Sequence, residues 1–264
     1  MKISAFYYNV LRACEETGKS LEEILNIFKA EGLSALEFNC MDVTEEISEI
    51  LDKVGLGISS LYRSVRLSEG IELEKGMQLV EKAAQLGCKN VMVVPGIYPE
   101  DSDMEEAKTR IYDGLSKIAA YSEQKQIRVT IEDFDCERTT LGSAEDMHWY
   151  GSRIPNLYYT FDTGNFSDLN CLQKHFHVLK HKIVHVHCKD YTLQPIFTQK
   201  VHISSSGTRL YGAPFGCGML PSKEILQWLK AIRYDGYLNI EQTNADNHMN
   251  AVLNALKWLK ENGW

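Results

Sequence analysis

Short apolar runs alternate with longer amphipathic segments along this chain of 264 residues. The short runs are rich in β-branched and aromatic residues and end in polar or glycine-containing sequence, which is typical of strands buried on both faces of a parallel sheet. In chain order, the predicted strands lie at 2–8, 35–39, 56–65, 89–94, 129–134, 157–161, 183–190 and 237–242.

The segments between these strands have apolar positions at helical spacing, and several carry helix-start signals. Ser20 followed by Glu23 forms a capping-box pattern, and Gly32 ends the same segment. The predicted helices lie at 20–32, 44–54, 72–86, 102–126, 143–153, 172–181, 222–232 and 247–260.

Eight strand and helix pairs without a domain break predict an α/β fold, a single-domain (β/α)8 TIM barrel over residues 1–264. An open doubly wound sheet would carry a glycine-rich phosphate loop after its first strand, and residues 9–14 do not form one. The connection at about 191–220, after the seventh strand, is far longer than the usual loop of about two to six residues, which favours a functional loop.

Four ionisable residues follow buried runs at the ends of the last four barrel strands: Glu132, Asp162, His187 and Glu241. The carboxyl ends of barrel strands line the active site, so these side chains can reach one point. Their burial would be costly without a neutralising partner, and a divalent cation is the natural one. Three carboxylates and one imidazole suit Mn²⁺, Mg²⁺ or Co²⁺, with Zn²⁺ as a further candidate.

The runs VTIEDF, YYTFDTGN, VHVHCKDY, GAPFGCGMLP and GYLNIEQ resemble, in order and spacing, the xylose-isomerase-like TIM barrel family of sugar and sugar-phosphate isomerases and epimerases. The resemblance implies that Glu132, Asp162, His187 and Glu241 hold one metal ion. It also implies that Glu132 and Glu241 flank a sugar substrate, one removing a proton and the other returning it through an enediolate. Which glutamate acts first is open.

One position departs from the family pattern. The ketose 3-epimerases of this family have a histidine three residues after the aspartate of the sixth strand, whereas this chain has Asn165. This counts against a specific 3-epimerase and leaves Asn165 as a hydrogen-bonding residue for the substrate. Loss of water from the same enediolate, as in dehydratases of the inosose or dehydroshikimate type, is an alternative. An abasic-site endonuclease and a sugar-binding barrel without catalysis are less well supported.

Several other polar residues are candidates for substrate handling. Arg63 near the end of the third strand, and Lys200, His202 and Arg209 in the long connection, suit a phosphate or sugar hydroxyls, although solvated loop residues are the simpler interpretation. His185 is expected to lie one layer below His187, either as a residue that supports the metal ligands or as part of the core. The sequence leaves open whether Glu37 lies in the site or pairs with a nearby Arg or Lys.

Composition limits the partners. A formal charge of −8 counts against a nucleic-acid partner, which normally requires a basic stripe. The sequence contains no run of about 18 apolar residues, so no membrane span is predicted. Seven scattered cysteines without a CxxC pair favour reduced thiols in a cytoplasmic protein. A homo-oligomer is compatible with the sequence, which does not determine the oligomeric state.

Overall fold

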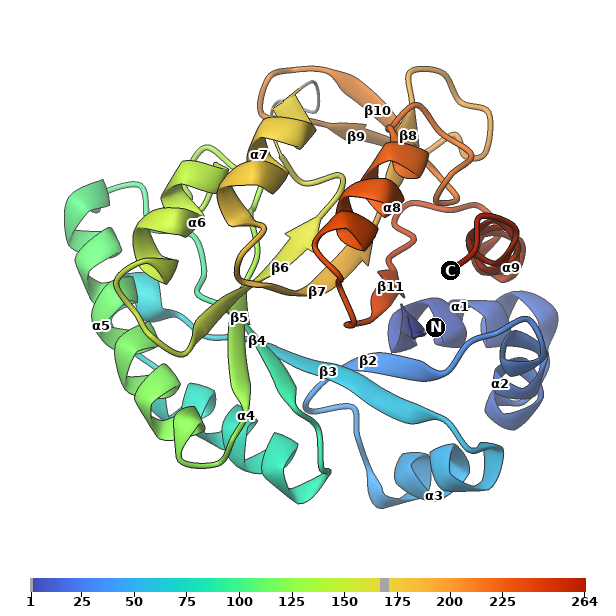
Figure 1. Ribbon diagram of the computed structural model, residues 1–264, viewed down its shortest axis with the longest axis horizontal. Helices are drawn as coiled ribbons and strands as arrows, with labels where there is room; N and C mark the ends of the chain where they lie inside the picture. Colours follow the sequence, from blue (N-terminus) through green and yellow to red (C-terminus); the bar gives the residue numbers. More distant parts are fainter. Residues whose placement is uncertain (1, 167–170) are drawn as a thin grey trace. The chain divides into compact units, whose positions relative to one another are not determined.

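The computed structural model describes residues 2–166 and 171–264. Eight strands form a closed barrel in the order β1-β11-β7-β6-β5-β4-β3-β2, which confirms the predicted fold class (Figure 1). The barrel strands are β1 Ile3–Phe6, β2 Ala35–Asn39, β3 Gly57–Ser64, β4 Asn90–Val94, β5 Arg128–Ile131, β6 Leu157–Asp162, β7 Ile183–Cys188 and β11 Leu238–Ile240.

Helices follow the strands, and their starts match the capping signals. Ser20 and Glu23 form the complete capping box at the start of the second helix, and Thr44, Ser143 and Asn247 accept backbone N–H groups at later helix starts. The helices are α1 Tyr7–Thr17, α2 Leu21–Ala30, α3 Glu45–Val54, α4 Leu73–Gln85, α5 Met104–Glu123, α6 Ala144–Gly151, α7 Leu172–Leu179, α8 Ser222–Ala231 and α9 His248–Glu261, with a short 3₁₀ helix η1 at Leu67–Glu69.

The first helix was not predicted from the sequence. The expected strand at 2–8 ends at Phe6, and Tyr7 already begins α1. Phe6 makes no side-chain capping bond, so the usual start signal is missing. Instead Asn9 secures the helix start through long-range bonds: its Nδ2 donates to the Gln242 carbonyl at 2.7 Å, and its Oδ1 accepts from the Gln242 N–H at 3.1 Å. Sequence patterns cannot reveal such a partner, 233 residues away.

The described residues form two compact units. The first contains residues of 1–59, 162–164 and 186–264, and the second contains residues of 60–161 and 165–185. Strands β3, β6 and β7 each contain residues of both units. That residues 1–264 act as one domain stays a prediction.

In the first unit, β1 pairs in parallel with both β2 and β11, and β11 pairs with β7. Helices α1 and α9 pack side by side (Figure 1). Glu16 near the end of α1 caps the start of α9, because its carboxylate accepts the N–H groups of His248 at 2.8 Å and Met249 at 3.1 Å. The same carboxylate lies 2.7 Å from His248 Nδ1.

The long connection after β7, predicted as a loop at about 191–220, contains regular secondary structure. It contains a three-stranded antiparallel sheet in the order β8-β10-β9, made of Asp190–Thr192, Val201–Ile203 and Arg209–Ala213. Asp190 holds the returning chain, because its carboxylate accepts backbone N–H groups from Gly216, Gly218 and Leu220 at 2.9–3.0 Å.

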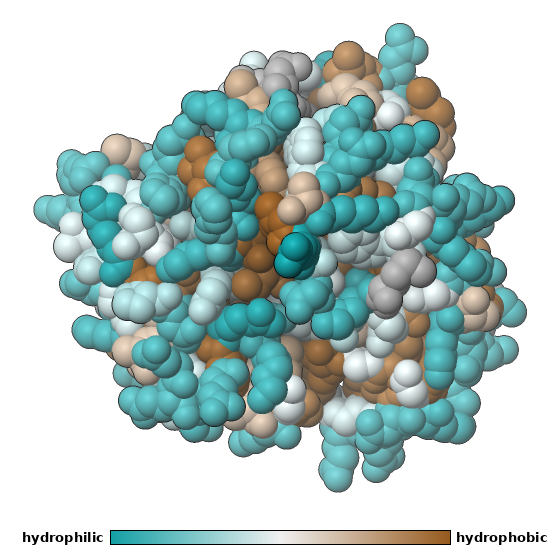
Figure 2. Space-filling model, in the orientation of Figure 1, coloured by the Kyte–Doolittle hydropathy of each residue, from teal (hydrophilic) through white to brown (hydrophobic). Residues whose placement is uncertain are grey.

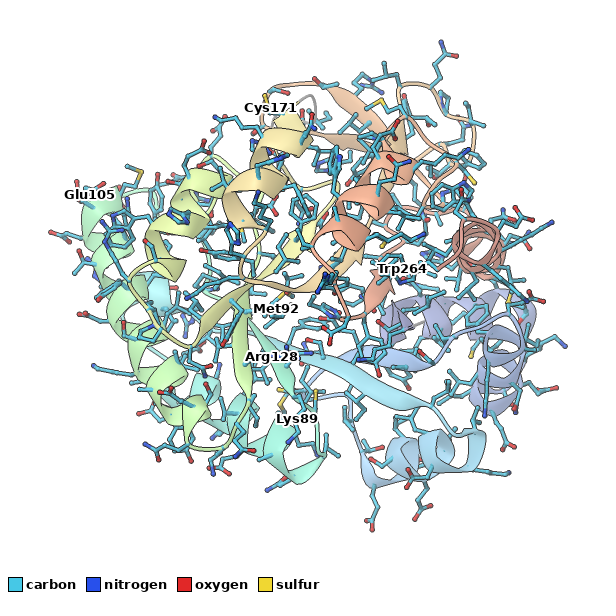
Figure 3. The ribbon with its side chains drawn as sticks, in the orientation of Figure 1. Lys89, Met92, Glu105, Arg128, Cys171 and Trp264 are labelled. Atoms are coloured by element: carbon cyan, nitrogen blue, oxygen red, sulfur yellow. The ribbon has the colours of Figure 1, made fainter. Side chains whose placement is uncertain are left out.

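In the second unit, β3, β4, β5 and β6 pair in parallel. The N-terminal ends of β4 and β5 are joined where the Arg128 N–H donates to the Lys89 carbonyl at 2.9 Å (Figure 3). Helices α4 and α5 pack closely, because a Cβ at Gly76 would collide with Ile118. The side chains at strand ends in this unit are therefore carried on a rigid frame.

The outer helix surfaces are mostly hydrophilic on the face seen in Figure 2, as amphipathic helices over a barrel require. In the described part of the chain, no helix combines the length and the apolar character needed to cross a membrane. No disulfide is assigned among the seven cysteines, all of which lie in the described part of the chain.

We predict that Glu16→Gln lowers the free energy of unfolding by about 1–2 kcal/mol at pH 7, because it weakens the cap of α9. Burial raises the pKa of Glu16, but the hydrogen bonds from His248 and Met249 outweigh it and lower the pKa below its usual value. A lowered carboxyl pKa stabilises the fold above the usual pKa of glutamate, and this contribution is lost as the pH falls through the lowered value. The deficit of the variant should therefore shrink between pH 7 and about pH 3 in urea unfolding.

Glu15→Gln is the matched control for Glu16→Gln. Glu15 is exposed and forms an ion pair with Arg12, which is exposed as well, so its replacement should change stability by less than about 0.5 kcal/mol. Equal effects of the two substitutions would contradict the assigned cap.

Candidate metal centre

His187 is the centre of a buried charged cluster in the first unit. It lies near the end of β7, in register with Asn239 of β11, and its side chain has no exposed surface. Its Nδ1 atom faces two carboxylates, with Glu241 Oε2 at 3.1 Å and Asp162 Oδ2 at 3.7 Å. The structure thus brings together three of the four predicted metal ligands.

Backbone hydrogen bonds fix these three residues at their strand ends. The Glu241 N–H donates to the Cys188 carbonyl at 3.2 Å, and the Thr163 N–H donates to the His187 carbonyl at 3.1 Å. These bonds extend the pairing of parallel strands past the last residue of β11 and of β6. Side chains that alternate in direction along each strand then place the ionisable group inward and its apolar neighbours toward the helices.

The opposite edge of the imidazole contacts a third carboxylate. His187 Nε2 lies 3.0 Å from Glu37 Oε2, and both side chains are fully buried. The tautomer with its proton on Nε2 donates to Glu37 and would present the Nδ1 lone pair to a metal ion held between Asp162 and Glu241. The edge of the Phe6 ring also contacts the imidazole, at 4.9 Å between centroids. Glu37 therefore orients the histidine, a role that the sequence analysis left undecided.

Lys189 completes the cluster, although it was not predicted as a site residue from the sequence. Its Nζ atom lies 2.9 Å from Asp162 Oδ2 and 2.8 Å from Glu241 Oε1, and only 8% of its side chain is exposed. The alternation rule could have found it, since residues 187 and 189 lie on the same face of an extended chain. An ammonium group thus already occupies the space between two predicted metal ligands.

Asp162 is ionised in this environment. Burial raises the pKa of its carboxyl group, but the neighbouring Lys189 and His187 lower it further than burial raises it. The Gly164 N–H also donates to Asp162 Oδ1 at 2.7 Å and stabilises the charge. By contrast, burial strongly raises the pKa of the Cys188 thiol, so this cysteine is neutral and unsuited to be a nucleophile.

The donor set fits a divalent cation. Asp162, His187 and Glu241 each offer a ligand atom, and these atoms lie within 4.8 Å of one another. Carboxylate oxygens with one imidazole nitrogen suit hard or borderline metals. The contacts of Lys189 support this fit, because they show that two of the carboxylates already bind a positive charge.

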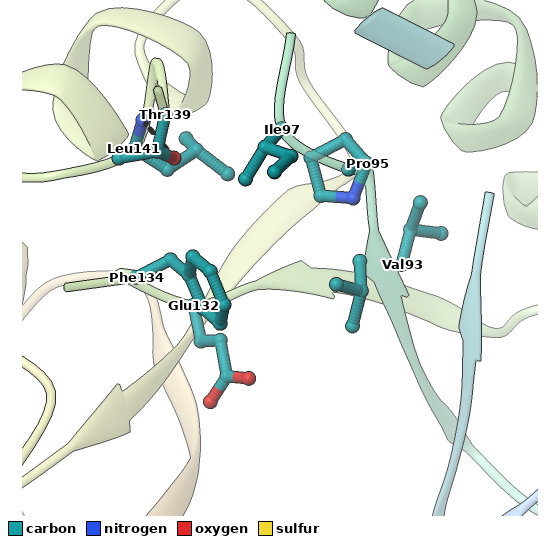
Figure 4. Close-up of a pocket in the computed structure, with 9 residues that line it drawn as sticks. Val93, Pro95, Ile97, Glu132, Phe134, Thr139 and Leu141 are labelled. Carbon is teal, nitrogen blue, oxygen red and sulfur yellow. Dashed lines mark hydrogen bonds between the residues drawn. The ribbon is translucent and has the colours of Figure 1, made fainter. Parts of the chain in front are cut away.

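Glu132, the fourth predicted ligand, lies in the second unit directly after β5 and is partly buried. It lines a pocket of about 260 Å³ formed by the segments that follow β4 and β5 (Figure 4). In the same unit, Asn165 Nδ2 donates to the Asp133 carbonyl at 3.2 Å, and His185 is fully buried on β7. The roles predicted for these residues stay predictions.

The remaining candidates lie on other elements. Arg63 Nη1 donates to Gln78 Oε1 on α4 at 3.1 Å. Arg209 is exposed on β10, and His202 on β9 stacks on Tyr191 with 6.0 Å between ring centroids. Lys200 Nζ donates to the Ala245 carbonyl at 3.2 Å. Substrate binding by Arg63, His202 and Arg209 stays a prediction.

The model of the xylose isomerase-like TIM barrel family matches residues 34–262. Three similar solved structures illustrate the range of proteins with this fold. A D-tagatose 3-epimerase-like protein is 20% identical, with a TM-score of 0.76, and the alignment covers 99% of this chain and 97% of the other. The probable 3-DHS dehydratase AsbF of Bacillus anthracis is 17% identical, with a TM-score of 0.75 and coverage of 98% and 99%. An AP endonuclease, family 2, of Brucella melitensis is 14% identical, with a TM-score of 0.73 and coverage of 99% of both chains.

At these identities the similarity shows the fold alone. No curated protein matches the chain in sequence. The activity therefore has to be argued from the residues of the site.

We predict that Glu37→Gln weakens Mn²⁺ binding by about 10- to 100-fold, because the loss of the carboxylate partner reduces the basicity and the fixed orientation of His187. Isothermal titration calorimetry with MnCl₂ measures this change. His187→Ala should abolish binding, whereas Glu49→Gln, at an exposed position of α3, should leave it unchanged. Unchanged affinity in Glu37→Gln would contradict the proposed role of Glu37.

Lys189→Met should have opposite effects on the metal-free protein and on metal binding. Removal of the ammonium leaves Asp162 and Glu241 close together without their counter-ion, so the free energy of unfolding without metal should fall by about 3 kcal/mol. The same change removes a competing positive charge, so Mn²⁺ should bind more tightly and raise the melting temperature more than in the wild type. Weaker Mn²⁺ binding by the variant would show that Lys189 supports the metal site instead of competing for it.

Proposed function

Because the chain belongs to the xylose isomerase-like TIM barrel family, we propose that it is a divalent-metal-dependent isomerase or epimerase of a sugar or sugar phosphate. The observation that carries this proposal is the cluster of Asp162, His187 and Glu241, whose donor atoms converge in the first unit. As in the sequence analysis, we assign Glu132 as the fourth ligand. The reaction we propose is proton transfer through an enediolate.

The ligand residues differ in exposure, and this difference suggests separate roles. Asp162 and His187 are fully buried, whereas 19% of the Glu241 side chain is exposed. Asp162 and His187 are thus suited to hold a metal ion, which when bound would polarise a substrate carbonyl and stabilise the negative charge that develops on its oxygen. Glu241 is suited to reach a substrate as well.

Glu241 is our candidate for one of the two groups that move the proton. The ammonium of Lys189 lies 2.8 Å from Oε1 and forms an ion pair with this glutamate. Oε2 lies on the other side, 3.1 Å from His187. Glu132 is the second candidate.

Lys189 also supplies positive charge that does not depend on a metal. In the enediolate the substrate becomes an anion, and an ammonium held between two strand ends stabilises such charge without reorganisation. We therefore propose that Lys189 contributes electrostatically to the reaction.

Two features favour a small carbohydrate over nucleic acid. The formal charge of the chain is −8, and the ends of β2, β3 and β4 carry no histidine that could bind additional metal ions among the residues described there. A dehydratase would proceed through the same enediolate, so its products, and not this geometry, separate it from an isomerase.

The proposal is tested by following hydrogen exchange of ketoses and ketose phosphates in D₂O by proton NMR, with protein purified without chelator and supplied with Mn²⁺. We expect incorporation of deuterium next to the carbonyl, and a decrease of about 10²- to 10⁴-fold in Glu241→Gln and in Glu132→Gln. Glu145→Gln, on the surface of α6, is the control that should retain full exchange.

The products decide among the alternatives. Exchange together with a new isomer or epimer supports the proposal, and loss of water from the substrate would identify a dehydratase. Absence of exchange with every sugar, or full exchange in both glutamate variants, would refute the proposed proton transfer.

A further inference from the structure

We propose that the pocket beside Glu132 binds an apolar substituent of the substrate, so that the substrate is an unphosphorylated sugar derivative with an alkyl or aryl group. This inference rests on the proposed function, because it takes Glu132 as a residue that reaches the reacting carbon. It narrows the substrate class, which the sequence left open between sugars and sugar phosphates.

The lining of the pocket is almost entirely apolar. Among the described residues around it, Glu132 is the one charged side chain and Thr139 the one hydroxyl. The lining consists of Val93, Val94, Pro95, Gly96, Ile97, Glu132, Phe134, Thr139 and Leu141. A phosphate here would meet a carboxylate and no cationic residue of this lining, whereas phosphate sites normally supply Arg, Lys or several N–H groups.

Two large apolar side chains of the pocket remain accessible to solvent. Phe134 is 44% exposed and Ile97 is 38% exposed. Both belong to segments that follow strand ends, where substrate-binding residues of a barrel are found. An apolar group that covers them would gain the free energy of burying this surface.

The walls of the pocket are preformed. The Phe134 N–H donates to the Leu141 carbonyl at 2.9 Å, and the Ser68 hydroxyl donates to the Ile97 carbonyl at 2.8 Å. The Tyr98 N–H donates to the Arg138 carbonyl at 3.0 Å, which joins the segment after β4 to the segment after β5. A ligand therefore does not have to order these segments, which keeps the entropic cost of binding low.

The volume suits a group larger than a methyl. The pocket measures about 260 Å³, and a closed apolar cavity of roughly 150 Å³ accommodates a benzene molecule. An aryl ring or a short branched alkyl chain fits this space. Bound water would find few polar partners in it.

The orientation of Glu132 suggests how such a ligand lies. Its carboxyl group points away from the side chains of Thr139 and Leu141, while the ring of Phe134 lies between them (Figure 4). The reacting part of the sugar would contact the carboxylate, and its substituent would extend toward Ile97 and Leu141. A single ligand can thus contact both the Glu132 carboxylate and the apolar side chains of the pocket.

Nearby cationic residues of the second unit are engaged elsewhere. Arg63 donates to Gln78 and to the Lys75 carbonyl on α4, at 3.1 and 3.4 Å. Arg138 donates to the Tyr98 carbonyl at 3.4 Å and lies 3.9 Å from Glu100. Neither residue belongs to the lining of the pocket.

The test compares n-butyl β-D-glucopyranoside, methyl β-D-glucopyranoside and D-glucose 6-phosphate as probes. Their affinities for the full chain with Mn²⁺ are measured by calorimetry, and contacts of the butyl group by saturation-transfer NMR. We expect the butyl glucoside to bind at least about tenfold more tightly than the methyl glucoside, because three additional methylene groups are buried. D-glucose 6-phosphate should bind no more tightly than the methyl glucoside.

Two variants test whether the preference for the butyl glucoside depends on residues of the pocket. Phe134→Ala should reduce the preference for the butyl glucoside to less than about threefold, because part of the apolar wall is removed. Ile97→Lys, at a partly exposed position that tolerates a charge, should reduce binding of the butyl glucoside and increase binding of D-glucose 6-phosphate. Ile203→Lys is the matched control, since Ile203 is 58% exposed on β9 and does not line the pocket.

Equal affinity for the two glucosides, absence of binding by the butyl glucoside, or tighter binding of D-glucose 6-phosphate by the wild type would overturn the inference. Its failure is distinguishable from failure of the proposed function, because hydrogen exchange in D₂O is measured separately. A butyl preference without exchange for any sugar would support the pocket and refute the proposed proton transfer. Exchange of a ketose phosphate without a butyl preference would refute the pocket alone.

Discussion

Buried carboxylates that must be neutralised determine how side chains are arranged at the carboxyl ends of the strands in the first unit. Glu37 and Asp162 are fully buried, Glu241 is mostly buried, and all three face His187 or Lys189. Burial of a carboxylate without a positive or hydrogen-bonding partner would cost several kcal/mol, so each of these contacts is a condition for folding. Three carboxylates against one lysine and one titratable histidine leave a site that favours a further cation.

Packing and hydrogen bonds hold this cluster on several sides. His187 is held on one edge by Glu37 and Phe6, while Asp162 is held by the Gly164 N–H. Asp190, three residues after His187, fixes the long connection through backbone N–H groups from residues 216–220. Side chains held in this way suit the proposed metal site, because preorganised ligands need no rearrangement when a ligand binds.

The second unit presents different chemistry at its strand ends. Its pocket has apolar walls and one carboxylate, whereas the cluster in the first unit consists of charged groups. The apolar walls of the pocket in the second unit match an apolar substituent of a substrate. Fold similarity alone does not provide this distinction, because the same barrel occurs in proteins described as 3-epimerase-like, as a probable dehydratase and as an AP endonuclease.

Local sequence patterns were sufficient to predict the barrel and most helix starts, because strand periodicity and capping depend on near neighbours. They also predicted that Asp162, His187 and Glu241 lie close together. They did not reveal α1, which begins without a capping side chain and depends on the bonds between Asn9 and Gln242. They also did not reveal the pairing of Glu37 with His187, 150 residues away, or the position of Lys189 between two carboxylates. These features depend on which distant strand ends meet, and only the tertiary structure decides that.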